Sequence, residues 1–349
     1  MQPARNVIPD DSSPTRIPIV SDILDRYDQL WKSFIRPSRR PYPLETLGPM
    51  KRQMDDMITY DRIDDYVLNH RSLKLEYTLY QIRGPPRRIQ KGKILIYLHA
   101  HSAGRKDGIF LLENAYKLGL SVCVFDFSGS GLSEGEYVTL GYEEHKDIES
   151  ILKELRMNYS YQNFIFWGRS MGAVAALLHA EKNPNSVDFM VLDSPFSSVL
   201  DMIQDTSATY LNVPEFVIKM AVNVVLDSCK DRIGYDLTDL KPIDAAKKIR
   251  KVPALFASSK SDELVLYTRV KSMYDEYKGP KFFHTIKGSH VCPREPEEIL
   301  AIFQCIAEHC NRADAFKWLK KPSYPITDPK PDINIFRSEY SSHGHTPVD

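Results

Sequence analysis

The sequence contains no apolar run that could cross a membrane. Its longest apolar stretches, Ile94–Leu98 and Val187–Leu192, have the length of strands, whereas a membrane helix needs roughly 20 apolar residues. The first residues, MQPARNVIPDDSSPTRIP, lack the apolar core of a secretory signal, and Gln2 stands where N-myristoylation requires glycine. We therefore expect no spanning helix, no secretion and no simple acylation.

Excess charge of either sign is also missing. The 46 Lys and Arg residues balance 46 Asp and Glu residues, so no net field attracts nucleic acid, and we expect no nucleic-acid partner.

Cysteine is scarce: the sequence has five cysteines, an odd number, and no two of them form a Cys-x-x-Cys motif. They are Cys123, Cys229, Cys292, Cys305 and Cys310. This usage indicates reduced thiols and a cytoplasmic location, with intermolecular pairing or a redox role of Cys310 left open.

Composition divides the chain into four stretches. Residues 1–20 are polar and Pro-rich and are expected to be disordered, because they bury too little apolar surface to offset the entropy of ordering. Apolar residues at helical spacing after Ser21 predict a helix within a leader, 21–60, that docks on the body. Its acidic polar face disfavours the alternative of a membrane-surface helix. The body covers 61–310, and the Pro-rich residues 311–349 are expected to form a flexible tail.

The body alternates extended apolar runs with helical patterns. Strands are predicted at 65–69, 73–82, 93–99, 121–126, 163–167, 187–193, 252–258 and 281–286, the first two as a hairpin. Helices are predicted at 107–118, 142–157, 171–182, 266–278 and 296–310. Short, nearly all-apolar strands separated by helices indicate an α/β fold with a mostly parallel central sheet and helices on both faces.

One interval breaks this rhythm. Between residues 199 and 248, a helix from Pro214 to Asp227 is apolar around much of its circumference. Such a helix is either buried on two sides or covers a pocket. We interpret the interval as a small lid insertion.

The most informative segment for function is NFIFWGRSMGAVAALLHA, residues 163–180. An apolar strand runs into Gly168-Arg169-Ser170-Met171-Gly172, and a helix rich in Ala and Leu follows without a loop. A turn this tight strains its central residue, and the flanking glycines remove Cβ atoms that would collide. The pattern predicts that Ser170 is a nucleophile presented at a sharp elbow, next to the electropositive N-terminus of a helix.

A serine nucleophile needs a base and a group that orients the base. Asp262 and His290 each follow the end of a predicted strand, and the order Ser170, Asp262, His290 is that of the α/β-hydrolase triad. Asp193, which ends the strand after the nucleophile's helix, is the alternative acid. We favour Asp262 because its loop is polar, whereas Asp193 precedes Ser-Pro-Phe, which suggests a pocket wall.

The segment HAHSAG, residues 99–104, follows another predicted strand. Its loop can direct the main-chain N–H of His101 toward an oxyanion, together with the N–H of Met171. His99 and His101 could also be interpreted as a metal pair, but no third ligand is suggested nearby, and we expect no metal and no cofactor.

A glycine-rich segment, FDFSGSGLSEG at 125–135, invites a dinucleotide interpretation. Its glycine spacing is G-x-G-x-x-x-G, and no helix start follows, so a structural turn beside the active site is the better interpretation. Phe196, in the strand end at 193–196, either lines an acyl pocket or packs in the core.

With these motifs in order, the sequence resembles the α/β-hydrolase-fold serine hydrolases. It is most similar to single-domain prolyl-oligopeptidase-like and serine-aminopeptidase-like members, including the depalmitoylase-like group and homologues in protozoa. The resemblance covers about Tyr60 to Cys310 and rests on YLHAHSAG, FDFSGSGLSEGE, FWGRSMG, LDSPFSS, the Asp262 loop and GSH. It implies an α/β-hydrolase fold and the triad of Ser170, Asp262 and His290.

The sequence departs from that family at one position, where Ala100 replaces the usual glycine of the oxyanion loop. A Cβ there costs about 1 kcal/mol if the backbone needs positive φ. Three functions therefore stay open: hydrolysis of a carboxylic ester or thioester, cleavage of a short peptide as a serine aminopeptidase would, and binding by a catalytically impaired hydrolase fold. The expected partner is a small-molecule acyl ester, thioester or short peptide.

Overall fold

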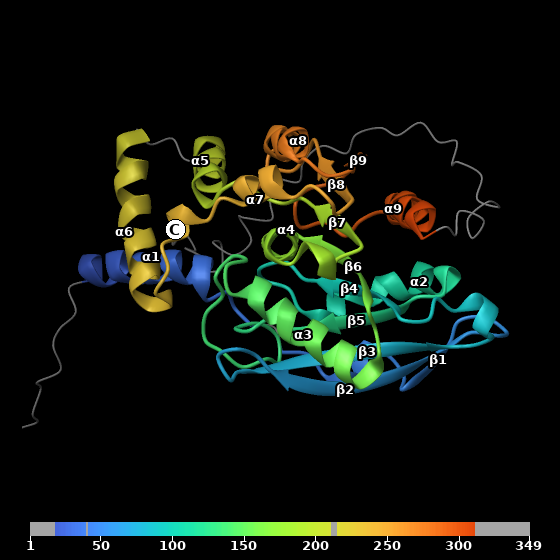
Figure 1. Cartoon of the computed structure of the whole chain (residues 1–349). Helices are drawn as coiled ribbons and strands as arrows, with labels where there is room; N and C mark the ends of the chain where they lie inside the picture. The colour runs from blue at the N-terminus through green and yellow to red at the C-terminus, as the bar shows by residue number, and fades with distance from the viewer. Residues whose placement is uncertain (1–17, 40, 211–214, 311–349) are drawn as a thin grey trace, which may run out of the picture.

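The computed structural model describes residues 18–39, 41–210 and 215–310, and a nine-stranded sheet runs through this part of the chain (Figure 1). The order is β1-β2-β3-β5-β4-β6-β7-β8-β9. The strands are β1 (Lys51–Gln53), β2 (Thr59–Leu68), β3 (Lys74–Arg83), β4 (Lys93–Leu98), β5 (Ser121–Phe125), β6 (Asn163–Arg169), β7 (Phe189–Asp193), β8 (Ala254–Ser259) and β9 (Lys281–Ile286). From β5 to β9 all neighbours are parallel, whereas β1, β2 and β3 join antiparallel. The mostly parallel sheet predicted from the sequence is confirmed.

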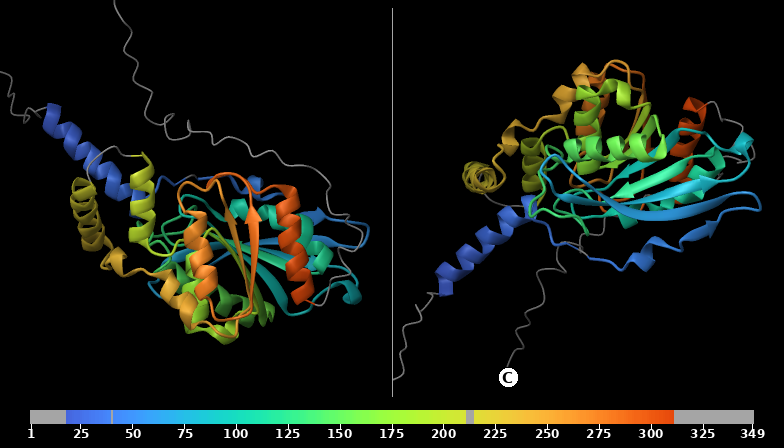
Figure 2. Two further views of the ribbon diagram at one scale, coloured as in Figure 1. Left: turned by 90° about the horizontal axis from the view of Figure 1, so that it is seen from above. Right: turned by 60° about the horizontal axis from the view of Figure 1, so that its bottom comes forward.

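Helices cover both faces of the sheet (Figures 1 and 2). One face packs against α3 (Glu144–Tyr159), α4 (Met171–Lys182) and α8 (Tyr267–Glu276); the other packs against α2 (Leu112–Leu118) and α9 (Pro296–His309). Each face of the sheet carries one hydrophobic core, and strand β6 contributes side chains to both, because successive side chains point to opposite faces. Phe164 and Phe166 lie in the first core, and Ile165 and Trp167 in the second.

Several boundaries differ from the predicted ones. The predicted strand at 65–69 overlaps only the last four residues of the ten-residue β2, which begins at Thr59 and ends at Leu68. The predicted helix at 107–118 begins as the 3-10 helix η3 (Arg105–Leu111), which continues into α2. The sequence does not predict β1, since three polar residues on a sheet edge show no hydrophobic alternation.

Between β7 and β8 the chain forms α5 (Val199–Tyr210), α6 (Glu215–Ile233), the 3-10 helix η5 (Leu237–Asp239) and α7 (Pro242–Lys248). Helix α6 packs against the leader helix α1 (Pro18–Ile35), where the Arg232 guanidinium lies 3.9 Å from the Trp31 ring centroid (Figure 1). Leu226 and Cys229 are buried, while Val224 remains 55% exposed. The described part of α6 is thus buried on one side, which does not agree with burial on two sides, the first of the two alternatives given by the sequence.

Some predictions fall outside the described residues. Residues 1–20 are expected from the sequence to be disordered; residues 1–17 are outside the described part, and helix α1 begins at Pro18. The tail at 311–349 lies there entirely. Within the described ranges, no helix has the length and hydropathy that a membrane span requires.

Candidate active site

Ser170 occupies a tight turn between strand β6 and helix α4. Its backbone has φ of 50° and ψ of −115°, a conformation that residues with a Cβ rarely adopt. A Cβ on Gly172 would lie 2.0 Å from the carbonyl oxygen of Leu98, and a Cβ on Gly168 would lie 2.5 Å from the carbonyl oxygen of Gly172. Glycine is therefore required on both sides of Ser170, and the turn holds this residue at the carboxyl end of β6.

Hydrogen bonds join Ser170, His290 and Asp262, which lie far apart in the sequence. The Ser170 Oγ is 3.0 Å from His290 Nε2, and His290 Nδ1 is 2.8 Å from Asp262 Oδ2. All three residues are buried, with 6%, 6% and 3% of their surface exposed. An ionised carboxylate can only accept, so Nδ1 carries the imidazole proton and Nε2 is left to accept the Ser170 hydroxyl proton.

The Asp262 carboxylate is itself fixed by the turn that follows β8. Its Oδ1 accepts main-chain N–H bonds from Leu264 at 3.1 Å and from Val265 at 2.8 Å. These bonds leave Oδ2 directed at His290. The imidazole is therefore held in one orientation by a carboxylate that cannot rotate freely.

Asp193, the alternative acid, lies in a buried ion pair. Its carboxylate accepts two hydrogen bonds from Arg294, at 3.0 Å from Nε and 2.7 Å from Nη2. Burial acts to raise the pKa of Asp193, but the charge and hydrogen bonds of Arg294 outweigh it, and the net result is a lowered pKa. Of the two candidate carboxylates, Asp262 is the one that the structure brings to His290.

Arg169 connects the serine turn to the histidine loop. Its Nη2 donates to the carbonyl oxygens of His290 at 2.8 Å and Cys292 at 2.6 Å. No role of Arg169 or Arg294 is predicted from the sequence. Arg169 stands inside the glycine motif, which is a usable signal, but the partners of a buried arginine depend on tertiary structure that the sequence pattern does not contain.

The two candidate oxyanion donors come from different elements. Met171 is the first residue of α4, where main-chain N–H groups lack an intrahelical acceptor. His101 lies in the loop after β4. Ala100, in the same loop, is not among the residues with positive φ, so its Cβ introduces no backbone strain. The penalty considered from the sequence does not arise at this position.

The imidazoles of this loop make structural contacts. His101 Nε2 donates to the carbonyl oxygen of Phe34 at 2.8 Å, and burial lowers the pKa of His101 to about 4, so the ring is neutral at pH 7. His99 Nε2 accepts from the main-chain N–H of Phe127 at 3.0 Å. In the described part of the chain, no group of three or more His, Cys, Asp or Glu residues could hold a metal ion.

The glycine-rich segment at 125–135 forms a turn around Asp126. The Asp126 carboxylate accepts from the Tyr42 hydroxyl at 2.6 Å and from the Arg105 main-chain N–H at 2.7 Å. A Cβ on Gly131 would lie 2.2 Å from the carboxyl carbon of Asp126, so glycine is required there. The segment thereby ties the leader to the start of η3.

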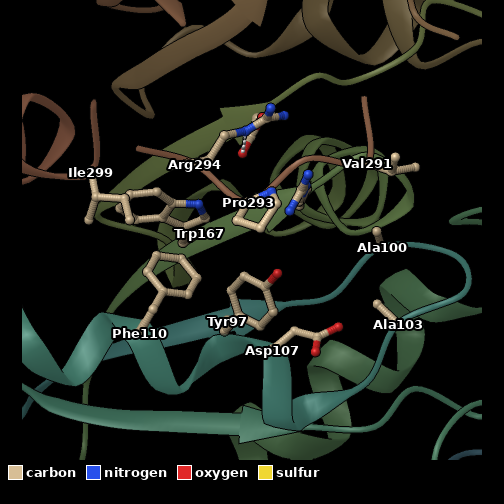
Figure 3. A pocket seen from close by; sticks show the side chains of 12 residues that line it. Tyr97, Ala100, Ala103, Asp107, Phe110, Trp167, Val291, Pro293, Arg294 and Ile299 are labelled. Carbon is tan, nitrogen blue, oxygen red and sulfur yellow. Dashed lines mark hydrogen bonds and ion pairs between the residues drawn. The ribbon is translucent and has the colours of Figure 1, made fainter. Parts of the chain in front are cut away.

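A cavity of about 380 Å³ lies beside these residues (Figure 3). It is lined by Tyr97, Ala100, Ala103, Asp107, Phe110, Trp167, Arg169, Asp193, Val291, Pro293, Arg294 and Ile299. Arg169 and Val291 are the chain neighbours of Ser170 and His290, which places the cavity next to the triad. Among the described residues of the interval 199–248, none is in this lining, and Phe196 is buried in the core.

Comparison with known proteins agrees with this architecture. A family model described as serine aminopeptidase, S33, matches residues 102–228. The uncharacterised protein YqkD of Bacillus subtilis is 28% identical over 176 residues, which are 50% of this chain and 56% of that protein. The α/β-hydrolase domain-containing protein WAV2 of Arabidopsis thaliana is 26% identical over 171 residues, 45% of this chain and 49% of WAV2. Over part of its length the chain is therefore similar to α/β hydrolases.

Solved structures show the same fold. An esterase of Pyrococcus furiosus matches with a TM-score of 0.56 at 19% identity, covering 81% of this chain and 97% of the esterase. The chain spans about half the length of the curated relatives YqkD and WAV2.

Proposed function

We propose that the protein is a serine hydrolase that cleaves a carboxylic ester or thioester by acyl transfer. The observation that carries this proposal is the hydrogen-bonded chain from Ser170 Oγ through His290 to Asp262 Oδ2. In a buried site, such a chain converts a weakly nucleophilic hydroxyl into an efficient nucleophile, because a base lies within reach of its proton.

In the first half of the reaction, Ser170 Oγ attacks the substrate carbonyl carbon while its proton moves to His290 Nε2. The resulting imidazolium is stabilised by the carboxylate of Asp262. The main-chain N–H groups of Met171 and His101 donate to the oxyanion. His290 then passes the proton to the departing alkoxide or thiolate, the bond to the leaving group breaks, and an acyl-Ser170 intermediate remains.

In the second half, water replaces the alcohol or thiol. His290 takes a proton from water as its oxygen attacks the acyl carbon, and returns that proton to Ser170 Oγ as the acid departs. The cycle consumes one ester or thioester and one water. It releases one acid and one alcohol or thiol, and the reaction requires no cofactor.

Peptide cleavage is the second candidate, because the matching family model is described as a serine aminopeptidase. The same triad serves either reaction, and the leaving group alone differs. A panel of acyl esters, acyl thioesters and aminoacyl amides separates the candidates. We expect kcat/KM to be highest for esters or thioesters; higher values for aminoacyl amides would favour the peptidase.

The nucleophile is tested by labelling the folded protein with a fluorophosphonate and locating the modified residue by mass spectrometry. We expect modification of Ser170 and complete loss of labelling in Ser170→Ala. Ser194→Ala is the matched control, because Ser194 is also buried with positive φ after the neighbouring strand, yet contacts Arg294 instead of an imidazole. A folded wild-type protein that stays unlabelled would favour the third possibility, a binding protein without catalysis.

A further inference from the structure

Two buried polar side chains face the cavity beside the triad without a partner. Tyr97 is 2% exposed and Trp167 is 1% exposed, and within the described ranges neither the Tyr97 hydroxyl nor the Trp167 Nε1 makes a hydrogen bond. Figure 3 shows both groups turned toward the cavity. Since buried tyrosine and tryptophan usually pair their polar atoms, these two donors are available to a group that enters the cavity.

The cavity walls also have an aromatic character. The rings of Tyr97 and Phe110 lie 5.8 Å apart at 87°, and those of Phe110 and Trp167 lie 5.5 Å apart at 82°. Aromatic rings pack favourably edge to face. The walls of the cavity therefore present both ring faces and ring edges to an aromatic ligand. The volume of about 380 Å³ is near the lower end of the roughly 300–1,000 Å³ typical of ligand pockets, so the group it receives is compact.

The charged residues of the lining balance one another. Arg294 is paired with Asp193, and the Arg169 guanidinium donates to two carbonyl oxygens. Asp107, also in the lining, supplies one further negative charge, which offsets the positive charge of Arg169. A neutral ligand therefore fits this cavity better than a carboxylate or an ammonium group.

We propose that this cavity binds the ring-bearing half of the substrate, a compact neutral aromatic group whose oxygen accepts hydrogen bonds from Tyr97 and Trp167. The proposal rests on the ester hydrolysis proposed above and names its substrate class. Tyr97 and Trp167 then determine specificity by rejecting rings that lack the oxygen, because their donors would stay unpaired.

The test uses pairs of esters that differ in one feature. Methyl 4-acetylbenzoate and methyl 4-isopropylbenzoate carry the ring on the acyl side, and 4-acetylbenzyl and 4-isopropylbenzyl acetates carry it on the alcohol side. Acetyl and isopropyl groups have the same number of non-hydrogen atoms, but only acetyl has an acceptor. In at least one series, we expect kcat/KM to favour acetyl, and Tyr97→Phe and Trp167→Phe to reduce that preference about fivefold each.

Comparing the preference between variants cancels the intrinsic reactivity of the two esters. Tyr66→Phe is the matched control for Tyr97→Phe, because Tyr66 is 51% exposed and outside the cavity lining. Circular dichroism establishes that each variant is folded. A preference unchanged in both folded variants, in both series, overturns the proposal.

Binding to Ser170→Ala separates this proposal from the proposed function. Isothermal titration calorimetry with the intact acetyl esters measures occupancy without turnover. Tighter binding of the acetyl esters, lost in Ser170→Ala/Tyr97→Phe, supports the cavity assignment even if fluorophosphonate labelling fails. Labelling and ester hydrolysis without any acetyl preference would leave the hydrolase intact and overturn the cavity assignment.

Discussion

Removing the carboxylate charge of Asp193 should destabilise the fold strongly. Asp193 is 1% exposed and Arg294 is 8% exposed, so Asp193→Asn leaves a buried guanidinium without its counter-ion. Breaking a buried ion pair on one side costs about 3–5 kcal/mol of unfolding free energy. At roughly 2–4 °C per kcal/mol for a domain of this size, Tm should fall on the order of 10 °C.

Urea unfolding and calorimetry measure this effect. Asp275→Asn is the matched control, because the side chain of Asp275 is 58% exposed in its ion pair with Lys271, and a surface pair contributes about 0–1 kcal/mol. A double-mutant cycle with Arg294→Gln should show coupling, since the double variant has no unpaired charge. A loss below about 1 kcal/mol for Asp193→Asn would refute the assignment of a strong buried pair.

The pH dependence has a definite sign. The pKa of Asp193 is lowered in the folded protein, so its contribution is fully present above the ordinary aspartate pKa of about 3.9 and is lost as pH falls through the lower folded pKa. The stability difference between wild type and Asp193→Asn should therefore persist from neutral pH to about pH 4 and shrink below it. A difference that disappears already near pH 6 would contradict this reasoning.

Three further substitutions probe the site and its surroundings. Gly172→Ala should prevent formation of the serine turn, since its Cβ would lie 2.0 Å from the carbonyl oxygen of Leu98. We expect this variant to show no fluorophosphonate labelling and no cooperative thermal unfolding transition by circular dichroism. Ala100→Gly should change kcat/KM by less than about threefold, because Ala100 has no positive φ to relieve. Val224→Asp should leave the Tm and the ester preference nearly unchanged, because Val224 is 55% exposed and outside the cavity lining. A shift of acyl preference in Val224→Asp would support the lid hypothesis.

The candidate triad could be predicted from the sequence because its signals are local. A strand, a five-residue glycine motif and a helix follow one another without interruption around Ser170, and the conformation of that turn is dictated by the space available at Gly168 and Gly172. Asp262 and His290 each follow a strand of the parallel sheet, and the carboxyl ends of parallel strands meet at one edge. Residues that follow these strands in the sequence are therefore close together in the structure, as Ser170, Asp262 and His290 are.

The surroundings of the site could not be predicted in the same way. Tyr97 and Trp167 belong to apolar strand patterns, and nothing in those patterns distinguishes an aromatic ring packed in the core from one that faces a cavity. Arg294 and Asp193 lie 101 residues apart, and no periodicity links them. Such features depend on how neighbouring elements pack.

The location of the cavity changes how the substrate is expected to reach Ser170. The sequence favours entry beneath the interval 199–248, because its helix is broadly apolar. In the structure, helix α6 of that interval packs against α1, and the walls of the cavity include η3 and residues 291–299. The exposed apolar side chains described on α6, Met220 and Val224, are not in this lining. Since the two buried donors of Tyr97 and Trp167 face the cavity, selectivity should depend on those donors more than on apolar coverage from α6.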